Sequence, residues 1–325
     1  ATGLQMPTED DIKVQSTWAT FPESWFEQWD DKAIQNALVA TGGEQRYLKS
    51  RVKRRRRIRN QSELGKCNAS SNASGGEQIR EVQGMADIPL ADCFTYIQVN
   101  GGVDEGSSLP STFTNIQKVG LCPYSLQVGG MTKRFPNNAF KKSQVAPDIW
   151  AQAVHESARF RAVKCVKLPT DDFELFCRAA AIAIARKMPI VWAWHVGRNG
   201  SSLKNGMMQL GNGVGNHSNL IHEGKWVGGK TLVQPDNQNS WGPVANEVYG
   251  PKGASWGEGG FGLTTMEAST PLPCSRALTD NSPSASTYPD ELDKLLNREA
   301  LAADAHTRPI ASGGKWDANA YWVEL

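Results

Sequence analysis

The stretch IRNQSELGKC, residues 58–67, follows a run of basic residues, RVKRRRR, at residues 51–57. It ends in Cys67 and carries a glutamine, Gln61, shortly before the cysteine. A side-chain amide and the backbone N–H of a nucleophilic residue can together form an oxyanion hole, which stabilises the charge that develops during acyl transfer. A cysteine taken alone is more often a small buried hydrophobic residue. A nucleophilic role for Cys67 therefore requires that the chain also supply a base and a group that orients this base.

The chain contains five histidines from which the base could come. His217 follows a glycine-rich segment, GNGVG, and begins a short stretch, HSNLI, which we expect to be a strand. Side chains alternate along a strand, so His217, Asn219 and Ile221 would share one face and His222 would lie on the other. Only one of the two histidines can face a cleft from this strand, and we take His217 as the candidate base. The remaining histidines fit solvated or core positions better: His155, His195 and His306.

The group that orients the base is predicted in the segment NQNSWG, residues 237–242. The side-chain oxygen of Asn239 could accept a hydrogen bond from the imidazole and fix its tautomer, while Trp241 would shield this bond from water. A second Trp-Gly pair follows in WGEGGF, residues 256–261. Either pair alone would indicate only a turn with a packed aromatic residue, but both follow a cysteine and a histidine in this order.

Taken together, these segments resemble those of the papain-like cysteine peptidases, whose hallmarks are of the type NQGxCGSCW, NGG, a His that begins a strand, NSWG and WGExGY. In this chain they stand as NQ and Cys at 60–67, NGG at 100–102, NHS at 216–218, NSWG at 239–242 and WGEGGF at 256–261. The separation of the Cys and the His falls in the range of that family. The resemblance covers about residues 59–265, and the five segments in the right order make it specific.

The resemblance implies a catalytic set: Cys67 as nucleophile, His217 as base and acid, Asn239 as orienting residue and Gln61 as oxyanion donor. In that family the cysteine begins a helix beside the histidine. There the helix dipole and the imidazolium would lower the pKa of the thiol.

For substrate binding, the resemblance implies that Gly101 and Gly102 offer backbone groups to an extended peptide near Trp241. No metal and no cofactor are expected.

The chain also departs from the family pattern in the nucleophile loop. Asn68 stands where the family has Trp, and Ser70 replaces an aromatic residue. A disulfide of the family, which would join this loop to the glycine-pair loop, is absent because Leu64 and Val99 occupy the matching places. An insertion at residues 243–255 separates the two Trp-Gly pairs, and no inhibitory pro-region is recognisable before the nucleophile.

The expected fold class is α+β, with helices mainly first and strands second. The sequence predicts helices at residues 21–38 and 170–187 and a buried strand at residues 190–196, whereas residues 68–84 form a helix only if tertiary packing supports it. The resemblance implies two subdomains, one helical and one an antiparallel β-barrel-like sheet, with extensions at both ends. We expect these segments: an N-terminal extension (1–58), the helical subdomain (59–150), the β-rich subdomain (151–266), and a C-terminal linker and tail (267–325).

Composition limits the partners and the compartment. Lys and Arg number 35 against 33 Asp and Glu, so the net charge of +2 does not favour polyanions, and the run Arg51–Arg59 is weak evidence for a nucleic-acid contact. No secretory signal or membrane-spanning stretch is apparent. The six cysteines form no CxxC pair and no disulfide framework. Glycans would obstruct the predicted site, so we expect an intracellular protein; the Asn-x-Ser sequons begin at Asn60, Asn68, Asn72, Asn199 and Asn216.

Two functions remain open. The first is a thiol peptidase that forms a thioester acyl-enzyme on a peptide or protein substrate, or an acyltransferase that uses the same thioester. The second is a papain-like module with a docking role in a larger assembly, such as a virus particle. The aromatic residues of both extensions, Trp25 and Trp322 among them, would then form docking surfaces.

Overall fold

The computed structural model describes residues 3–5, 8–16, 19–40, 46–49, 58–86, 88–161, 164–169, 173–194, 203–204, 207–208, 216–226, 233–241, 261–264 and 275–279. The basic run at 51–57, the insertion at 243–255 and nearly all of the predicted C-terminal linker and tail lie outside the described residues.

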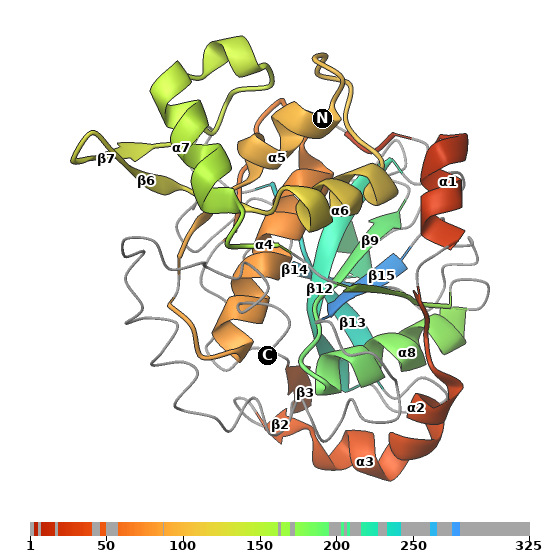
Figure 1. Ribbon diagram of the computed structural model, residues 1–325. Helices are drawn as coiled ribbons and strands as arrows, with labels where there is room; N and C mark the ends of the chain where they lie inside the picture. Colours follow the sequence, from red (N-terminus) through yellow and green to blue (C-terminus); the bar gives the residue numbers. More distant parts are fainter. Residues whose placement is uncertain are drawn as a thin grey trace.

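The described helices are distributed over the first part of the chain, followed by most of the strands (Figure 1). They are α1 (Glu9–Ser16), α2 (Glu23–Gln28), α3 (Asp31–Asn36), α4 (Cys67–Val82), α5 (Asp92–Val99), α6 (Leu109–Lys118), α7 (Pro147–Ser157) and α8 (Phe173–Ala185), with a short 3-10 helix at Lys142–Gln144. In the described part of the chain, no helix is long and apolar enough to cross a bilayer.

Most strands belong to one mixed sheet in the order β1-β8-β15-β9-β12-β13-β14-β11-β10, with β2 and β3 attached through β12. Its strands are β1 (Ala19–Thr20), β2 (Val39–Ala40), β3 (Arg46–Lys49), β8 (Lys164–Lys167), β9 (Ile190–Trp194), β10 (Leu203–Lys204), β11 (Met207–Met208), β12 (His217–Trp226), β13 (Val233–Gln238), β14 (Phe261–Thr264) and β15 (Ser275–Thr279). Two small antiparallel pairs lie apart from it: β4 (Leu90–Ala91) with β5 (Cys122–Pro123), and β6 (Ser125–Val128) with β7 (Met131–Arg134). The α+β class is therefore confirmed.

The central strand β12 has helices on both sides (Figure 1). Helix α4 packs against β12 and β9, and α5 and α6 pack against α4. Helix α8 packs against β12 and β13 and is covered in turn by α2 and α3. The start of β12 and the start of α4 thus meet where the helical part of the molecule adjoins the sheet.

Two of the predicted elements are confirmed and one is divided. Helix α8 lies within the helix predicted at residues 170–187, and β9 within the strand predicted at residues 190–196. The helix predicted at residues 21–38 is instead two helices, α2 and α3. The division occurs because the Asp30 side chain accepts a hydrogen bond from the N–H of Ala33 and so caps a new helix.

Helix α4 is buried along nearly its whole length although its sequence is a poor helix former. It consists largely of Ala, Ser, Asn and Gly, and these small side chains let the neighbouring elements approach closely. A Cβ at Gly76 would lie only 2.4 Å from Leu121 Cδ1. Tertiary packing therefore decides that this segment is a helix, as the sequence led us to expect.

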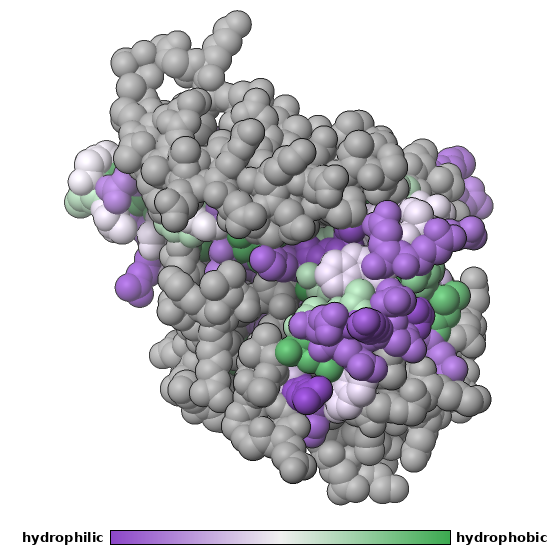
Figure 2. Space-filling view, turned by 90° about the horizontal axis from the view of Figure 1, so that it is seen from below, coloured by the Kyte–Doolittle hydropathy of each residue, from purple (hydrophilic) through white to green (hydrophobic). Residues whose placement is uncertain are grey.

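The N-terminal extension contributes to the core of the sheet. Phe21 and Trp25 are 7% and 2% exposed and belong to the apolar cluster that also contains Phe176 of α8 and Trp192 of β9. The outward side of α2 and α3 is largely hydrophilic (Figure 2), with exposed residues such as Glu27. The expectation that Trp25 forms part of a docking surface is therefore wrong, because its side chain is buried within the chain itself. Trp322 lies outside the described residues, and a docking role of the tail stays a prediction.

Candidate active site

The histidine that begins β12 is paired with the asparagine that follows β13. His217 Nε2 lies 2.8 Å from Asn239 Oδ1, and both residues are buried. Strands β12 and β13 are antiparallel neighbours, so the start of one lies beside the end of the other. This is the arrangement that fixes the orientation of an imidazole through one ring nitrogen and leaves the other for proton transfer. His217 Nδ1 has no hydrogen-bond partner among the described residues.

Aromatic rings enclose this pair. The ring of Trp241 stacks on His217 with centroids 4.5 Å apart, and Trp194 meets it edge-on at 5.8 Å. The sequence indicated a shielding role for Trp241, and the stacking agrees with it. Asn219 had no predicted role in the site, yet its side-chain amide lies 3.1 Å from both His217 Nε2 and Asn239 Oδ1. Its place two residues after His217 on the same strand face was the available signal.

The candidate nucleophile lies at the start of α4, next to the start of β12. Cys67 is the first residue of this 16-residue helix and is 0% exposed. The backbone of Gly3, Ser218 and Asn68 hydrogen-bonds to its thiol. Ser71, one turn further along α4, donates to the carbonyl oxygens of both Cys67 (2.9 Å) and Ser218 (3.0 Å). The thiol therefore lies beside the residue that directly follows His217.

Burial determines the protonation states of Cys67 and His217 while residues 3–5 cover the thiol. It raises the pKa of the Cys67 thiol to about 11, and the backbone hydrogen bonds offset only part of this effect. Burial also lowers the pKa of His217 to about 4, despite the hydrogen bond with Asn239. At neutral pH the pair is thus a thiol and a neutral imidazole. This differs from the lowered thiol pKa that the resemblance implies, because water does not reach Cys67 here.

Gln61 is buried in the loop before Cys67 and is tied to the NSWG segment. Its side-chain Oε1 accepts a hydrogen bond from Ser240 Oγ at 2.5 Å, and its backbone N–H donates a hydrogen bond to the Ser240 carbonyl oxygen at 2.8 Å. Its Nε2 donates to the Leu64 carbonyl oxygen at 3.1 Å. The predicted oxyanion donor and the predicted orienting segment, which are far apart in sequence, are therefore direct neighbours.

The glycine pair that the resemblance assigns to substrate binding lies in the loop after α5, and its role stays a prediction. Gly101 and Gly102 are exposed in a turn, and no atom lies within 4 Å of a Cβ built at either position. The backbone that does hold an extended segment is that of Ser107, in the same loop. Its N–H donates to the Gly3 carbonyl oxygen (2.9 Å), and its carbonyl oxygen accepts from the N–H of Gln5 (3.0 Å).

Residues 3–5 of the chain thus lie across the candidate nucleophile. Besides the contacts with Ser107, the N–H of Leu4 donates to the carbonyl oxygen of Asn216, the residue before His217, at 3.2 Å. Gly3 fits so closely that a Cβ would lie 1.9 Å from the Gly65 carbonyl oxygen. The N-terminal segment is therefore hydrogen-bonded to Ser107, in the loop after α5, and to Asn216, which precedes β12. It also packs against Gly65, in the loop before Cys67.

The departure from the family at Asn68 has a structural reason. Asn68 Nδ2 donates to the Ser108 carbonyl oxygen (2.7 Å) and to Thr112 Oγ1 (2.8 Å), so it joins α4 to the start of α6. Asn72 continues this polar contact one turn on by donating to Asn68 Oδ1 at 3.0 Å. A tryptophan could not make this set of bonds from this position, because its ring offers only one donor and no acceptor.

The other histidines of the described residues are separate from this site. His222 Nε2 lies 3.0 Å from Gln238 Oε1, so it has a different partner on the same neighbouring strand. His155 is exposed on α7. His195 and His306 lie outside the described residues.

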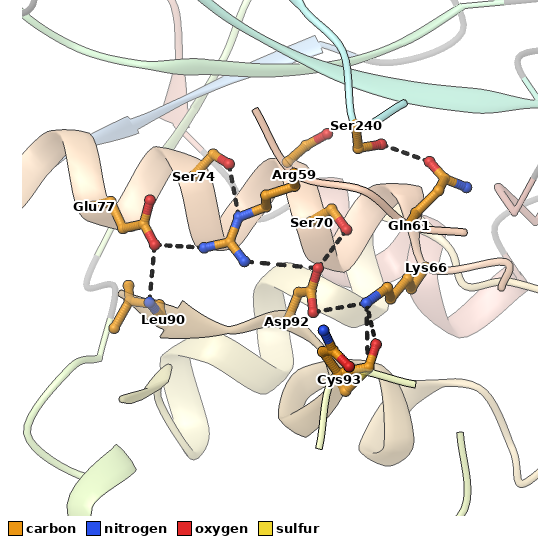
Figure 3. A network of polar contacts seen from close by, with 12 residues as sticks. Arg59, Gln61, Lys66, Ser70, Ser74, Glu77, Leu90, Asp92, Cys93 and Ser240 are labelled. Atoms are coloured by element: carbon orange, nitrogen blue, oxygen red, sulfur yellow. Dashed lines mark hydrogen bonds and ion pairs between the residues drawn. The ribbon is translucent and has the colours of Figure 1, made fainter. Parts of the chain in front are cut away.

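A network of buried charges holds the loop that carries Gln61 (Figure 3). At the N-terminal end of this loop, Arg59 donates hydrogen bonds to Glu77 Oε1 of α4 at 2.5 Å and to Ser74 Oγ at 2.9 Å. At the C-terminal end of the loop, Lys66 Nζ donates a hydrogen bond to Asp92 Oδ1 at 3.1 Å. Arg59 Nη1 also lies 3.7 Å from Asp92 Oδ2. One carboxylate, that of Asp92, therefore contacts both ends of the loop.

Further contacts hold Lys66 and Asp92 within this network. Lys66 Nζ also donates to the Asn137 carbonyl oxygen at 2.6 Å, and Ser70 Oγ donates to Asp92 Oδ2 at 2.7 Å. Burial alone would raise the pKa of Asp92, but the charges of Lys66 and Arg59 outweigh it and lower the pKa. Burial likewise opposes the charge of Lys66, and Asp92 outweighs it and raises that pKa. Both groups therefore stay charged.

Loss of the Asp92 charge should destabilise the protein. Asp92→Asn would leave the buried Lys66 without its carboxylate partner and Arg59 with Glu77 alone, so we expect the free energy of unfolding to fall by about 3–5 kcal/mol. Urea denaturation measures the change, with Asp148→Asn, an exposed aspartate on α7, as the matched control. A loss below about 1 kcal/mol, the range of exposed ion pairs, would contradict the role given to the network.

His217 should make stability depend on pH. Its pKa is about 4 in the folded protein against a normal value of 6.5, so between these values the unfolded chain binds a proton that the folded protein does not. The contribution is complete above the normal pKa and is lost as the pH falls towards the folded pKa. From about pH 7 to about pH 4, we expect the wild type to lose on the order of 3 kcal/mol more than His217→Gln.

Urea denaturation of both proteins at the two pH values tests this expectation. His155→Gln, which changes an exposed histidine, should keep the pH dependence of the wild type. The same loss of stability in His217→Gln and in the wild type would show that His217 is not buried in its neutral form.

Comparison with known proteins bears on the fold. No family model and no curated protein matches the sequence. Among solved structures, xylellain, a cysteine protease from Xylella fastidiosa, matches with a TM-score of 0.58 and 15% identity, over 86% of this chain and 96% of that chain.

Two further structures match less closely. Digestive procathepsin L 3 of Tenebrio molitor matches with a TM-score of 0.46 and 14% identity, over 71% of this chain and 68% of that chain. Bromelain from Ananas comosus, in complex with the E64 inhibitor, matches with a TM-score of 0.43 and 17% identity, over 68% and 91% of the two chains. The likeness to xylellain extends over most of both chains and agrees with the α+β arrangement of helices around β12. The chain therefore has the papain-like cysteine peptidase fold.

Proposed function

We propose that this chain is a thiol peptidase that cleaves peptide bonds with Cys67 as nucleophile, His217 as base and acid, and Asn239 as orienting residue. The observation that carries the proposal is the buried contact between His217 Nε2 and Asn239 Oδ1 at 2.8 Å, beneath the stacked ring of Trp241. This contact leaves His217 Nδ1 for proton transfer, and the Cys67 thiol lies beside the next residue, Ser218.

The reaction proceeds in two halves. The Cys67 proton passes to His217 Nδ1 and the sulfur attacks the peptide carbonyl carbon. The amine leaves with the proton from His217, and a thioester remains on Cys67. Water then gives a proton to His217 and attacks the thioester, which releases the carboxylic acid and restores the thiol. The Cys67 N–H and the Gln61 amide are the candidate donors to the oxyanion in both halves.

The N-terminal segment keeps this proposed peptidase latent. Gly3 hydrogen-bonds to the thiol and residues 3–5 occupy the backbone groups of Ser107 and Asn216 that an extended peptide would need. With water excluded, the thiol pKa is about 11 and little thiolate exists at neutral pH. Displacement of the segment would hydrate Cys67, and the position at the start of α4 then favours the thiolate.

An epoxide thiol probe tests the assignment of the nucleophile. In the chain carrying Gly3→Val, whose N-terminal segment cannot fit over Cys67, we expect it to modify Cys67 and none of Cys93, Cys122 and Cys177. The last three thiols stay buried, and burial raises the pKa of Cys93 to about 12 and that of Cys122 well above its normal value. Mass spectrometry of the labelled protein identifies the modified residue. Labelling that persists in Cys67→Ala, or that is unaffected in His217→Ala, would contradict the proposed roles.

Substitution of Gly3 tests latency separately. The side chain of Gly3→Val cannot fit against Gly65, so the segment should leave the site, and labelling of Cys67 near pH 7 should become at least about tenfold faster as the thiol pKa falls. Glu9→Val, which places the same side chain on the exposed side of α1, is the control. Measurable labelling of Cys67 at equal rates in Gly3→Val and the wild type would refute latency and leave the peptidase assignment intact.

A further inference from the structure

An exposed carboxylate joins the nucleophile loop to the loop that follows α5. Asp104 Oδ1 accepts a hydrogen bond from the N–H of Gly65 at 2.8 Å. The same oxygen accepts a hydrogen bond from the hydroxyl of Tyr96 at 2.5 Å. Gly65 lies two residues before Cys67, and Tyr96 is a fully buried residue of α5. A single oxygen atom thus joins the backbone next to Cys67 to helix α5.

The Tyr96 hydroxyl extends the contact to a second loop. Its oxygen accepts a hydrogen bond from the N–H of Gly106 at 3.2 Å. Burial and the hydrogen bond to Asp104 both raise the pKa of Tyr96, so its hydroxyl keeps the proton that it donates. The loops touch closely, because a Cβ at Gly65 would lie 2.8 Å from Gly106 N and 2.9 Å from the Tyr96 hydroxyl.

Gly106 matters because Ser107 follows it. The N–H and carbonyl oxygen of Ser107 hold residues 3–5 in an extended conformation across Cys67. These are the described backbone groups that would hold an extended peptide next to the thiol. The chain of contacts therefore runs from the nucleophile loop at Gly65, through Asp104 and Tyr96, to the peptide-binding backbone at Ser107.

We propose that Asp104 and Tyr96 are positioning residues, which fix the distance between Cys67 and the peptide-binding backbone of Ser107 so that a bound peptide presents its carbonyl carbon to the sulfur. This inference rests on the proposed peptidase function. Asp104 is exposed, so its two hydrogen bonds are not needed to compensate a buried charge. Misplacement by about 1 Å between a bound reactant and its catalytic group can reduce a rate by about a hundredfold.

The test compares two thiol reagents on Cys67 of the full chain carrying Gly3→Val. Iodoacetamide needs only an accessible thiol, whereas a peptidyl epoxide must also bind the Ser107 backbone. Both need the same exposure of Cys67, so the ratio of their rate constants isolates alignment from accessibility. In Tyr96→Phe and Asp104→Ala, we expect the ratio of peptidyl epoxide to iodoacetamide rates to fall at least about tenfold, because each variant removes at least one hydrogen bond to the charged carboxylate.

Three further variants sharpen the comparison. Asp104→Asn keeps an oxygen that can accept both hydrogen bonds and should retain most of the ratio. Glu105→Gln removes a neighbouring exposed charge, and Tyr124→Phe removes a phenol from another part of the chain; neither should change the ratio.

The outcomes separate the two proposals. If the Gly3→Val chain reacts with the peptidyl epoxide but Tyr96→Phe and Asp104→Ala leave the ratio unchanged, the positioning role is overturned and the peptidase function stands. If both reagents slow equally in these variants, the residues have only a structural role. If neither reagent modifies Cys67 in the Gly3→Val chain, the proposed function fails and the positioning role fails with it.

Discussion

The contact of Asp92 with Lys66 and Arg59 is the constraint on which the candidate site depends. These two cations mark the ends of the loop that carries Gln61, and both are almost fully buried. Charges in such surroundings are costly unless they are paired and hydrogen-bonded. The ion pairs at both ends restrict the conformation of the loop, and Cys67 follows Lys66 directly. The start of α4 is therefore positioned by electrostatics as much as by packing.

The interior around α8 and the interior around α4 are held together by different kinds of contact. Around α8, large apolar side chains such as Phe176 and Trp192 exclude water, and the N-terminal extension adds Phe21 and Trp25 to the same cluster. Around α4, small polar side chains bond to the backbone and to one another, as Asn68 does with Ser108. Polar groups in a low-dielectric interior hold their partners in one geometry, whereas apolar contacts tolerate small shifts. The candidate catalytic residues lie where these two kinds of interior meet.

Features that depend on short sequence segments could be predicted, and features that depend on contacts between distant segments could not. The order of the cysteine, histidine and asparagine segments predicted a papain-like fold, helical periodicity predicted α8, and a continuous apolar run predicted β9. The division between α2 and α3 had a local signal in Asp30, but a continuous aromatic pattern concealed it. Nothing local indicates that residues 3–5 cover Cys67, or that Ser107 holds them, because these contacts arise only when the chain has folded. The same holds for the low pKa of His217, which reflects burial rather than neighbours in sequence.

The link between Gly65 and Gly106 through Asp104 and Tyr96 is made of hydrogen bonds only. A thiol nucleophile must be kept in its reduced form, and any small thiol that protects it also attacks disulfides through thiol–disulfide exchange. A covalent sulfur link between the same two loops would therefore be exposed to the reagents that preserve the nucleophile. The hydrogen-bonded link has no oxidised and reduced forms. The contact between the two loops is consequently independent of the thiol concentration around the protein, and Cys67, the candidate nucleophile, can be kept reduced without loosening the loops that border it.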